Sequence, residues 1–364
     1  MRYTQLLLAA LCTATFAACS KKDNTTDTTQ AVSFETARTQ MQVDFTNNVA
    51  LPGYLDLKNA SADLYTKIRA LNADATDAHL DSAKTAWLRM RSVWERCEGF
   101  LFGPVEDNDY DPNMDTWPTD RNQMDSLLTS GTSFSVAAVQ GYTLSLRGYH
   151  PIEYIIFGDH GSRTAASLSA EQKQYMLALT EDLKNTCESL YDSWNTAPTS
   201  FAQQVIQAGS ANSAVYPKRI EFYTALVDGL IDICGEVGDG KMKEPFDAYL
   251  SNGAELVESP YSGSSLADFK NNLIGLQNVY LGTYNGKSGI GLKDVVAAKN
   301  KSLDQTIQAK MASAIASFDN ITVPYEQAIV TQRTQVKNTM DQIAELSDAL
   351  ENQLKPFVQT NITD

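Results

Sequence analysis

One short stretch of the sequence combines residue types that can bind a metal ion or transfer a proton. Residues 148–153 read GYHPIE, and they contain His150, one of only three histidines in the chain, with Glu153 three positions later. Residues three apart on a helix project to one side, so this imidazole and this carboxylate can ligate one metal ion. One imidazole with two carboxylates suits iron, zinc or manganese, so a further carboxylate is needed.

The same stretch also has a purely structural explanation. Proline is favoured at the first position of a helix, so Pro151 predicts that His150 lies near the helix N-cap. Glu153 then falls in the first turn, where the positive end of the helix dipole stabilises a carboxylate. By spacing alone, a polar helix start is the better interpretation of these residues.

A second group of candidate residues lies on a predicted helix with the sequence WLRMRSVWERCEGFLFGP, residues 87–104. At about 100° per residue, Trp87, Arg91, Trp94 and Glu98 fall on one face of this helix. Buried charge is costly unless it is paired, so Arg91 and Glu98 either lie at the rim of the apolar face or line a polar site. We expect Glu98 to supply the third metal ligand, with Arg91 orienting Glu98 or binding an anion.

Other catalytic and metal-binding motifs are absent or incomplete. The sequence contains no G-x-S-x-G and no H-E-x-x-H. Asp107, Asp109 and Asp111 lack the glycine and the final glutamate of an EF-hand, so we expect them to form turns in a solvated loop. His79 and His160 are expected at the surface or in loops.

Composition narrows the class of protein. The formal net charge of −15 disfavours non-specific binding of nucleic acid and favours the approach of cations. Cys97, Cys187 and Cys234 form no C-x-x-C, which excludes a zinc finger and predicts three buried, small apolar side chains. A disulfide between two of these cysteines is an alternative, because an exported chain meets an oxidising compartment.

The first residues predict export of the chain. Arg2 precedes an apolar run, residues 6–18, that is too short to span a bilayer, and small residues stand before Cys19. We interpret residues 1–18 as a signal peptide. The sequence FAAC at 16–19 resembles a bacterial lipobox, with Cys19 as the acylated residue. The polar residues 19–32 then form a flexible, lipidated tether.

Helical periodicity dominates the rest of the chain. Apolar residues recur in steps of three and four from Leu80 to Cys97, and further helices are predicted at 220–234 and 329–354. Ser169 and Gln172 form a capping box that opens another helix. Without a series of alternating strands, the sequence predicts an all-α fold of two antiparallel helix bundles packed side by side.

Two stretches interrupt the helical pattern, and a third suggests a domain boundary. Residues 103–120 and 251–265 are expected to form long irregular loops. The polar segment at 195–203 separates a first bundle, residues 33–198, from a second bundle, residues 199–364. The first bundle carries the His150 motif.

Several ordered blocks together resemble the imelysin family. Gly148, His150 and Glu153 fit the G-x-H-x-x-E motif of that family. Residues 87–104 and the following TWP look like its first-half signature. ESPYSGSSLADFKNNLIGLQNVYLGTY at 258–284 and GIGLKDVV at 289–296 look like its second-half signature. The match covers nearly the whole chain after the expected signal peptide.

The resemblance implies an all-helical fold of two related bundles, with the motif near their interface. It also implies an extracytoplasmic protein linked to bacterial iron uptake. His150 and Glu153 are its motif residues. The binding residues that the matched blocks add are Arg91, Ser259, Ser262 and Asp268.

These observations together predict an envelope lipoprotein, anchored at the outer membrane through Cys19, that binds iron or an iron-bearing small ligand. The expected metal ligands are His150, Glu153 and Glu98, with zinc as the alternative ion and other iron-uptake proteins of the envelope as partners. A metallopeptidase, with Glu98 or Glu153 as general base, ranks second because a tight ligand cannot also be a free base. A third alternative is an adaptor protein in which the His150–Glu153 pair holds two bundles together.

Overall fold

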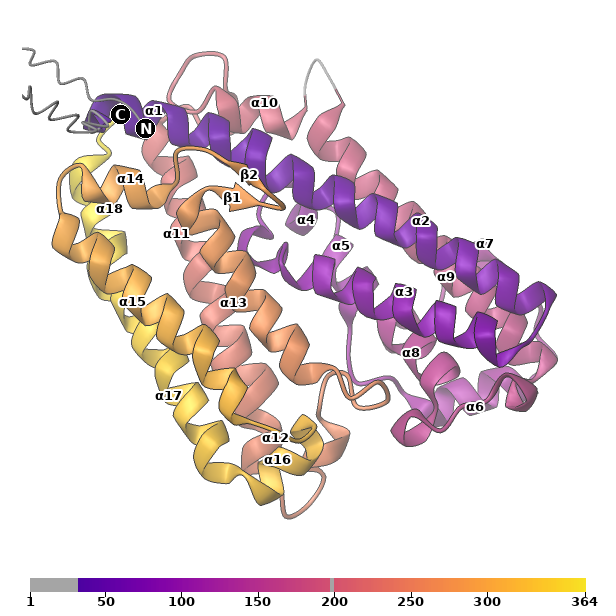
Figure 1. Cartoon of the computed structure of the whole chain (residues 1–364). Coiled ribbons are helices and arrows are strands. Elements are labelled where there is room, and N and C mark those ends of the chain that lie inside the picture. Colours follow the sequence, from indigo (N-terminus) through magenta and orange to yellow (C-terminus); the bar gives the residue numbers. More distant parts are fainter. Residues whose placement is uncertain (1–31, 197–199) are drawn as a thin grey trace, which may run out of the picture. The chain divides into compact units, whose positions relative to one another are not determined.

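The computed structural model describes residues 32–196 and 200–364, and these are almost wholly helical (Figure 1). The predicted all-α fold is therefore confirmed. The expected signal peptide and nearly all of the expected tether, with Cys19, lie outside the described residues. Within the described ranges, no helix combines the length and the apolar character needed to cross a membrane.

The longer helices make up the body of the structure, and several of them run side by side in Figure 1. α2 packs against both α3 and α9, while α15 packs against α17 and α13 against α3. Their bounds are α1 (Phe34–Asp44), α2 (Leu51–Ala73), α3 (Asp77–Glu95), α9 (Ala170–Asn195), α11 (Arg219–Gly235), α13 (Ser265–Leu281), α15 (Lys301–Ser317) and α17 (Arg333–Ala349).

Short helices connect the longer ones. They are α4 (Pro104–Asp107), α5 (Tyr110–Asp115), α6 (Arg121–Thr129), α7 (Val136–Val139), α8 (Tyr149–Phe157), α10 (Phe201–Ile206), α12 (Lys243–Asp247), α14 (Leu292–Ala297), α16 (Tyr325–Thr331) and α18 (Lys355–Asn361). A two-residue hairpin pairs β1 (Thr283–Tyr284) with β2 (Lys287–Ser288). Three π-helical turns are η1 (Phe45–Ala50), η6 (Glu236–Met242) and η9 (Leu350–Leu354).

Several single 3₁₀ turns lie between the helices. They are η2 (Glu98–Phe100), η3 (Leu144–Leu146), η4 (Asp159–Gly161), η5 (Ala165–Ser167), η7 (Gly253–Glu255) and η8 (Phe318–Asn320). Residues Val32–Asp364 form one compact unit. The division into bundles at 33–198 and 199–364 stays a prediction.

Local sequence signals explain where the main helices begin. The predicted capping box of α9 is present, because the Ser169 side chain accepts from the Gln172 N–H and the Gln172 side chain accepts from the Ser169 N–H. Thr76 caps α3 in the simpler way, accepting from the backbone N–H of His79 at 3.3 Å. On the inner face of α3, Trp87 and Trp94 are fully buried, as the periodicity predicts.

Three sequence expectations need correction. The predicted helix at 329–354 is divided, because α16 ends at Thr331 and α17 starts at Arg333. The stretch 103–120 is not wholly irregular, since it contains α4 and α5. Pro151 is the third residue of α8 and Gly148 is its N-cap, so His150 lies inside the first turn.

The three cysteines have the surroundings that their spacing predicts. Cys97, Cys187 and Cys234 are buried as free thiols. Burial raises the pKa of each of these thiols, which leaves them protonated and apolar at neutral pH. They contribute to packing and carry no chemistry of their own.

Two glycines set the backbone distances that the central site depends on. Gly148 has φ of +76°, and a Cβ at this position would lie 2.0 Å from the backbone oxygen of Met114. This close contact holds the start of α8 against the end of α5, next to Asp115. On α13, a Cβ at Gly275 would lie 2.5 Å from the oxygen of Arg96, so only glycine allows α13 to approach the end of α3.

Candidate metal centre

The interior contains a group of ionisable side chains that are each at most 5% exposed. We call this group the buried charge cluster. It combines six carboxylates with one guanidinium, one ammonium and one imidazole, contributed by helices and loops from both halves of the chain. Its members are Arg91, Glu95, Glu98, Asp115, His150, Glu153, Lys241, Glu258 and Asp268. Charges buried this deeply persist only when they are paired.

Arg91 lies at the centre of this cluster and not at a solvent-exposed rim. Its guanidinium donates to Asp115 and forms an ion pair with Glu95, one helical turn along α3. Nη2 also lies 3.2 Å from Oε1 of Glu258. The guanidinium stacks over the ring of Tyr149, 4.9 Å from its centroid. The partners of Arg91 are therefore Asp115, Glu95 and Glu258, and not Glu98.

His150 connects two carboxylates through its two ring nitrogens. Nε2 lies 3.0 Å from Oδ1 of Asp115, and Nδ1 lies 3.2 Å from Oε2 of Glu153. Burial alone lowers the pKa of His150, but these two hydrogen bonds outweigh burial and raise the pKa to about 9. At neutral pH the imidazole is therefore protonated and donates a hydrogen bond from each nitrogen.

Asp115 remains ionised although it is buried. Burial raises the pKa of Asp115, but the charge of Arg91 and the hydrogen bond from His150 hold the pKa well below its usual range. Its second oxygen, Oδ2, accepts from Nε1 of Trp94 at 2.7 Å. Trp94 thereby fixes the carboxylate of Asp115 in one orientation.

Glu153 is held by the loop that precedes α13. Its Oε1 accepts from the backbone N–H of Tyr261 at 3.1 Å, and from the N–H and hydroxyl of Ser262 at 2.7 and 2.8 Å. The remaining oxygen, Oε2, meets His150. A carboxylate that fixes the orientation of a histidine in this way is a common partner of metal-binding histidines.

The other predicted binding residues lie beside this loop. The backbone N–H of Ser259 donates to the hydroxyl of Ser265 at 3.3 Å, and Ser259 is fully buried. Asp268 accepts from the hydroxyl of Ser264 at 2.9 Å. Burial raises the pKa of Asp268 to about 7, and the charge of Arg91 limits this rise. Ser259 and Asp268 thus shape the loop that holds Glu153.

Glu98 lies in a different part of the cluster from His150. Its Oε2 is 2.9 Å from Nζ of Lys241 and accepts from Nδ2 of Asn272 at 2.6 Å. Asn272 donates in the same way to Oε2 of Glu95 at 2.6 Å. Burial, followed by the neighbouring charge of Glu95, raises the pKa of Glu98 well above its usual range.

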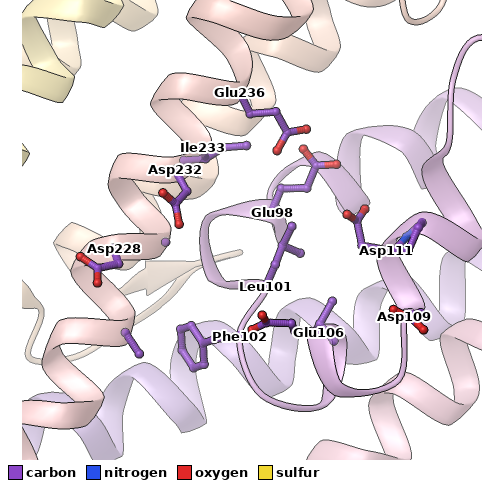
Figure 2. A pocket seen from close by; sticks show the side chains of 14 residues that line it. Glu98, Leu101, Phe102, Glu106, Asp109, Asp111, Asp228, Asp232, Ile233 and Glu236 are labelled. Carbon is purple, nitrogen blue, oxygen red and sulfur yellow. The ribbon is translucent and has the colours of Figure 1, made fainter.

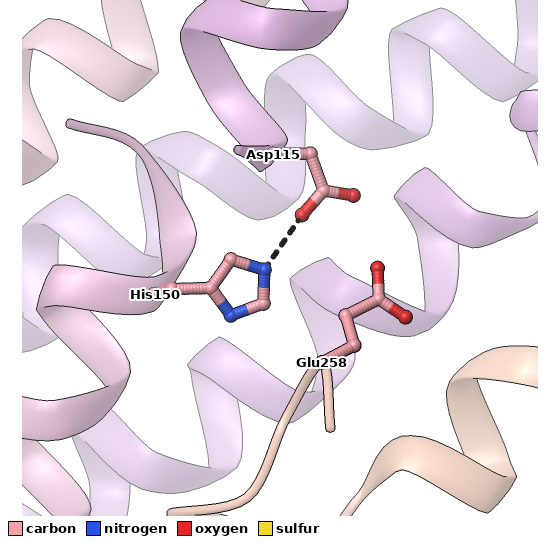
Figure 3. A group of neighbouring side chains, drawn as sticks. All are labelled: Asp115, His150 and Glu258. Atoms are coloured by element: carbon pink, nitrogen blue, oxygen red, sulfur yellow. Dashed lines mark hydrogen bonds and ion pairs between the residues drawn. The ribbon is translucent and has the colours of Figure 1, made fainter. Parts of the chain in front are cut away.

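Two sets of three residues in the cluster have ligand atoms that all lie within 4.8 Å of one another. One set is Asp115, His150 and Glu258 (Figure 3), and the other is Glu95, Glu98 and Asp115. The structure brings His150 and Glu153 together, as the motif predicts, but places Glu98 in the second set. That His150, Glu153 and Glu98 jointly bind a metal stays a prediction.

Glu258 has the property that a metal ligand needs. Its Oε1 is held by Arg91 and by Lys241, at 3.2 and 3.0 Å. Its Oε2 is buried and has no hydrogen-bond partner among the residues that the structure describes. Burial raises the pKa of Glu258 to about 8, and the charge of Lys241 limits this rise. A buried carboxylate oxygen without a partner is costly unless a cation or a proton binds it.

A cavity of about 520 Å³ leads to the first set of ligands. His150 and Glu258 lie in its wall, together with Arg121 and Tyr261. A second cavity, of about 450 Å³, has Glu98 in its wall (Figure 2). The first set of ligands is therefore reached from one cavity through His150 and Glu258, and the second set from the other cavity through Glu98.

Sequence reasoning missed Asp115, Glu258 and Lys241. Asp115 directly precedes the TWP of the first-half block, and Glu258 is the first residue of the second-half block. Their position in these blocks was the only available signal. Lys241 stands in the segment EVGDGKM, where no periodicity marks it as buried.

The fold and this cluster define an all-helical protein with a buried centre of histidine and carboxylates. The family model described as Imelysin matches residues 50–356, and the chain therefore belongs to the imelysin family. The chain is 29% identical over 320 residues to iron-regulated protein A of Synechococcus elongatus, a match that covers 86% of this chain and 85% of that relative.

Two solved structures have the same fold. One, described as an iron-regulated protein A precursor from Parabacteroides distasonis, has a TM-score of 0.81 at 23% identity and covers 91% of this chain and 100% of its own. An imelysin-like protein from Psychrobacter arcticum has a TM-score of 0.70 at 14% identity, over 90% of this chain and 97% of its own. At these identities the two structures establish the fold alone.

Proposed function

We propose that this protein binds a single iron ion through Asp115, His150 and Glu258, and that it serves iron acquisition in the bacterial cell envelope. The observation that carries this proposal is Oε2 of Glu258, which is buried beside His150 and Asp115 and has no partner within residues 32–196 and 200–364. One imidazole and two carboxylates form a set of ligands typical of non-haem iron, and zinc or manganese can bind the same set. Iron is favoured because a relative over most of the chain is named an iron-regulated protein.

Each proposed ligand is held in place through another of its atoms. Trp94 holds Oδ2 of Asp115, Arg91 and Lys241 hold Oε1 of Glu258, and Glu153 holds Nδ1 of His150. Such outer partners fix ligand orientation and raise metal affinity. An iron ion held by these residues would take the place of the proton that Nε2 of His150 now shares with Asp115. Glu153 then orients the histidine and does not itself bind the metal.

A structural role for Glu153 is consistent with this arrangement. Its contacts to His150, Tyr261 and Ser262 join α8 to the loop before α13. The adaptor hypothesis, in which the pair joins two parts of the fold, therefore describes Glu153 well. The adaptor hypothesis does not explain why Oε2 of Glu258 has no hydrogen-bond partner among the described residues.

A metallopeptidase is the second candidate, and one observation favours it. The cavity of about 520 Å³ that ends at His150 and Glu258 offers room for part of a substrate beside the metal. Glu153, however, has both oxygens engaged, so it is a poor general base. Cleavage of an unfolded protein substrate that depends on added metal and is lost in Glu258→Gln would favour the peptidase over a binding protein.

Export and anchoring are also part of the proposal. We infer them from the apolar run at 6–18, the sequence FAAC and the polar tether that follows. Acylation of Cys19 would attach the protein to the outer membrane, close to other iron-uptake proteins. Labelling cells with a radioactive fatty acid tests this, since Cys19→Ser should abolish incorporation.

Replacement of two carboxylates separates the two possible sets of ligands. Anaerobic titration of Fe(II) into wild-type protein should show one ion per chain. Glu258→Gln should weaken binding by about 10- to 100-fold, whereas Glu98→Gln, which removes none of the proposed ligands and acts only through Lys241, should weaken binding by less than about 10-fold. A large loss in Glu98→Gln with none in Glu258→Gln would instead support His150, Glu153 and Glu98 as the ligands.

A further inference from the structure

The ammonium group of Lys241 lies among four carboxylates, three of which belong to the buried charge cluster, while Glu236 lies at its edge. Nζ is 2.9 Å from Glu98, 3.0 Å from Glu258, 3.3 Å from Glu236 and 3.5 Å from Glu95. The side chain of Lys241 has no exposed surface. Such a concentration of negative charge in the interior requires a cation, and here the cation belongs to the protein itself.

Local backbone structure directs Lys241 into the cluster. It lies in the π-helical turn η6, between α11 and α12. A π turn inserts one extra residue and rotates the side chains that follow, and such turns are frequent at functional sites. The ammonium also lies over the ring of Trp117, 5.5 Å from its centroid, which adds a favourable contact.

Two of the carboxylates that contact Lys241, Glu95 and Glu98, also belong to a possible set of metal ligands with Asp115. Glu95, Glu98 and Asp115 each offer an oxygen within 4.8 Å of the others. Asp115 also belongs to the set that contains His150, so one carboxylate is shared between two neighbouring sets of ligands. A shared carboxylate is the usual bridge in sites that hold two metal ions.

Asn272 would add an oxygen ligand to this position after rotation of its side-chain amide. Its side chain is fully buried and directs Nδ2 to both Glu95 and Glu98. Its carbonyl oxygen Oδ1 has no hydrogen-bond partner among the described residues. An amide oxygen is a good ligand for a hard cation, and rotation of this amide would bring Oδ1 toward the two carboxylates.

An acidic cavity leads to the same position. Figure 2 shows Glu98 in the wall of the cavity of about 450 Å³, with its carboxylate near that of Glu236. Within the described part of the chain, the residues lining this cavity include seven carboxylates and no lysine, arginine or histidine. Negative potential focused in such a cleft raises the local concentration of cations.

We propose that Lys241 is a tethered cation that fills the second of two cation positions in the buried charge cluster, and thereby limits the protein to one bound metal ion. This inference rests on the proposed function, because the first position is the iron site at Asp115, His150 and Glu258. Lys241 is a residue that determines the stoichiometry of that centre. In its absence, Glu95, Glu98 and Asp115 form a second site for a divalent ion.

The test replaces Lys241 by methionine, which has a similar length and no charge. Mn²⁺ bound per chain is measured on desalted full-length protein by elemental analysis, and the electron paramagnetic resonance spectrum reports whether two Mn²⁺ ions are coupled. Wild-type protein should bind one ion and Lys241→Met two coupled ions. The control Lys243→Met, at an exposed lysine two residues along, should bind one. One ion in Lys241→Met, with the wild-type spectrum, overturns the inference.

Loss of folding in Lys241→Met is also informative. The double variant Lys241→Met with Glu98→Gln removes one charge of each sign, and it should fold and bind one ion. If Lys241→Met is unfolded without metal, Mn²⁺ should restore its folding, since two ions replace the lost ammonium. Failure of Mn²⁺ to restore folding, while the double variant folds, overturns the inference.

The metal content of the wild-type protein and of Lys241→Met distinguishes failure of this inference from failure of the proposed iron site. Wild-type protein that binds no metal contradicts the iron site itself. Wild-type protein that binds one ion, with no second ion in Lys241→Met, leaves the iron site intact and contradicts only the role of Lys241.

Discussion

Removal of the Glu153 carboxylate should destabilise the fold strongly, because this group joins α8 to the loop before α13. In Glu153→Ala, two backbone N–H groups and the hydroxyl of Ser262 lose their acceptor, and so does Nδ1 of His150. A buried donor left without a partner costs about 1–3 kcal/mol. Because Tyr261 and Ser262 are only half-buried and water can reach them, we expect a total loss of about 3–5 kcal/mol.

Glu153→Gln should be much milder. Its amide oxygen can still accept from Tyr261 and Ser262, whereas its NH₂ group faces Nδ1 of His150. Two donors then meet, so His150 must release the proton on Nδ1, and the pKa of His150 falls from its raised value of about 9. The expected loss of stability is about 1–2 kcal/mol.

Urea unfolding followed by tryptophan fluorescence measures both variants. Glu255→Ala, at an exposed glutamate near this loop, is the control and should change stability by less than about 0.5 kcal/mol. Stability of Glu153→Ala equal to that of the control would refute the reasoning. Equal losses in Glu153→Ala and Glu153→Gln would show that the hydrogen bonds of Oε1 do not set the magnitude.

Three further predictions concern pH and packing. Burial raises the pKa of Asp111 to about 7. The folded protein therefore loses stability as the pH rises from about 4 to about 7, because the buried carboxyl group must ionise. Asp111→Asn should raise the free energy of unfolding by about 2 kcal/mol at pH 8 and leave it unchanged at pH 4. The paired His150 stabilises the fold below pH 6.5 and loses this contribution as pH rises through about 9. Nuclear magnetic resonance should show that titration, since the chain has only three histidines. Gly148→Ala should cost more than about 2 kcal/mol in thermal unfolding, because its Cβ would meet the oxygen of Met114.

Features that depend on neighbouring residues were predictable from the sequence. The periodicity of α3, the capping box of α9 and the run of α11 follow from residues a few positions apart. The pairing of His150 with Glu153 was predictable for the same reason, since both residues lie on one turn of α8. These parts of the fold and of the site therefore required no knowledge of tertiary packing.

Features that depend on distant residues were not predictable from one sequence. Whether Arg91 lies at a rim or in the interior depends on Asp115 and Glu258, which reach it from other elements. Burial of a guanidinium is favourable only once those carboxylates are present. The sequence likewise gives no sign that Lys241, in a π turn, reaches Glu98.

The most direct test of the central claim is the Fe(II) affinity of His150→Ala beside that of the wild-type protein, measured by anaerobic calorimetry. We predict one Fe(II) per wild-type chain and a loss of at least about 100-fold in the variant, since the imidazole ligand that Glu153 orients is removed. The control His79→Ala, at a partly exposed histidine in the first turn of α3 that contacts no member of the cluster, should bind as the wild type does. Equal iron binding by His150→Ala and wild-type protein would contradict the account.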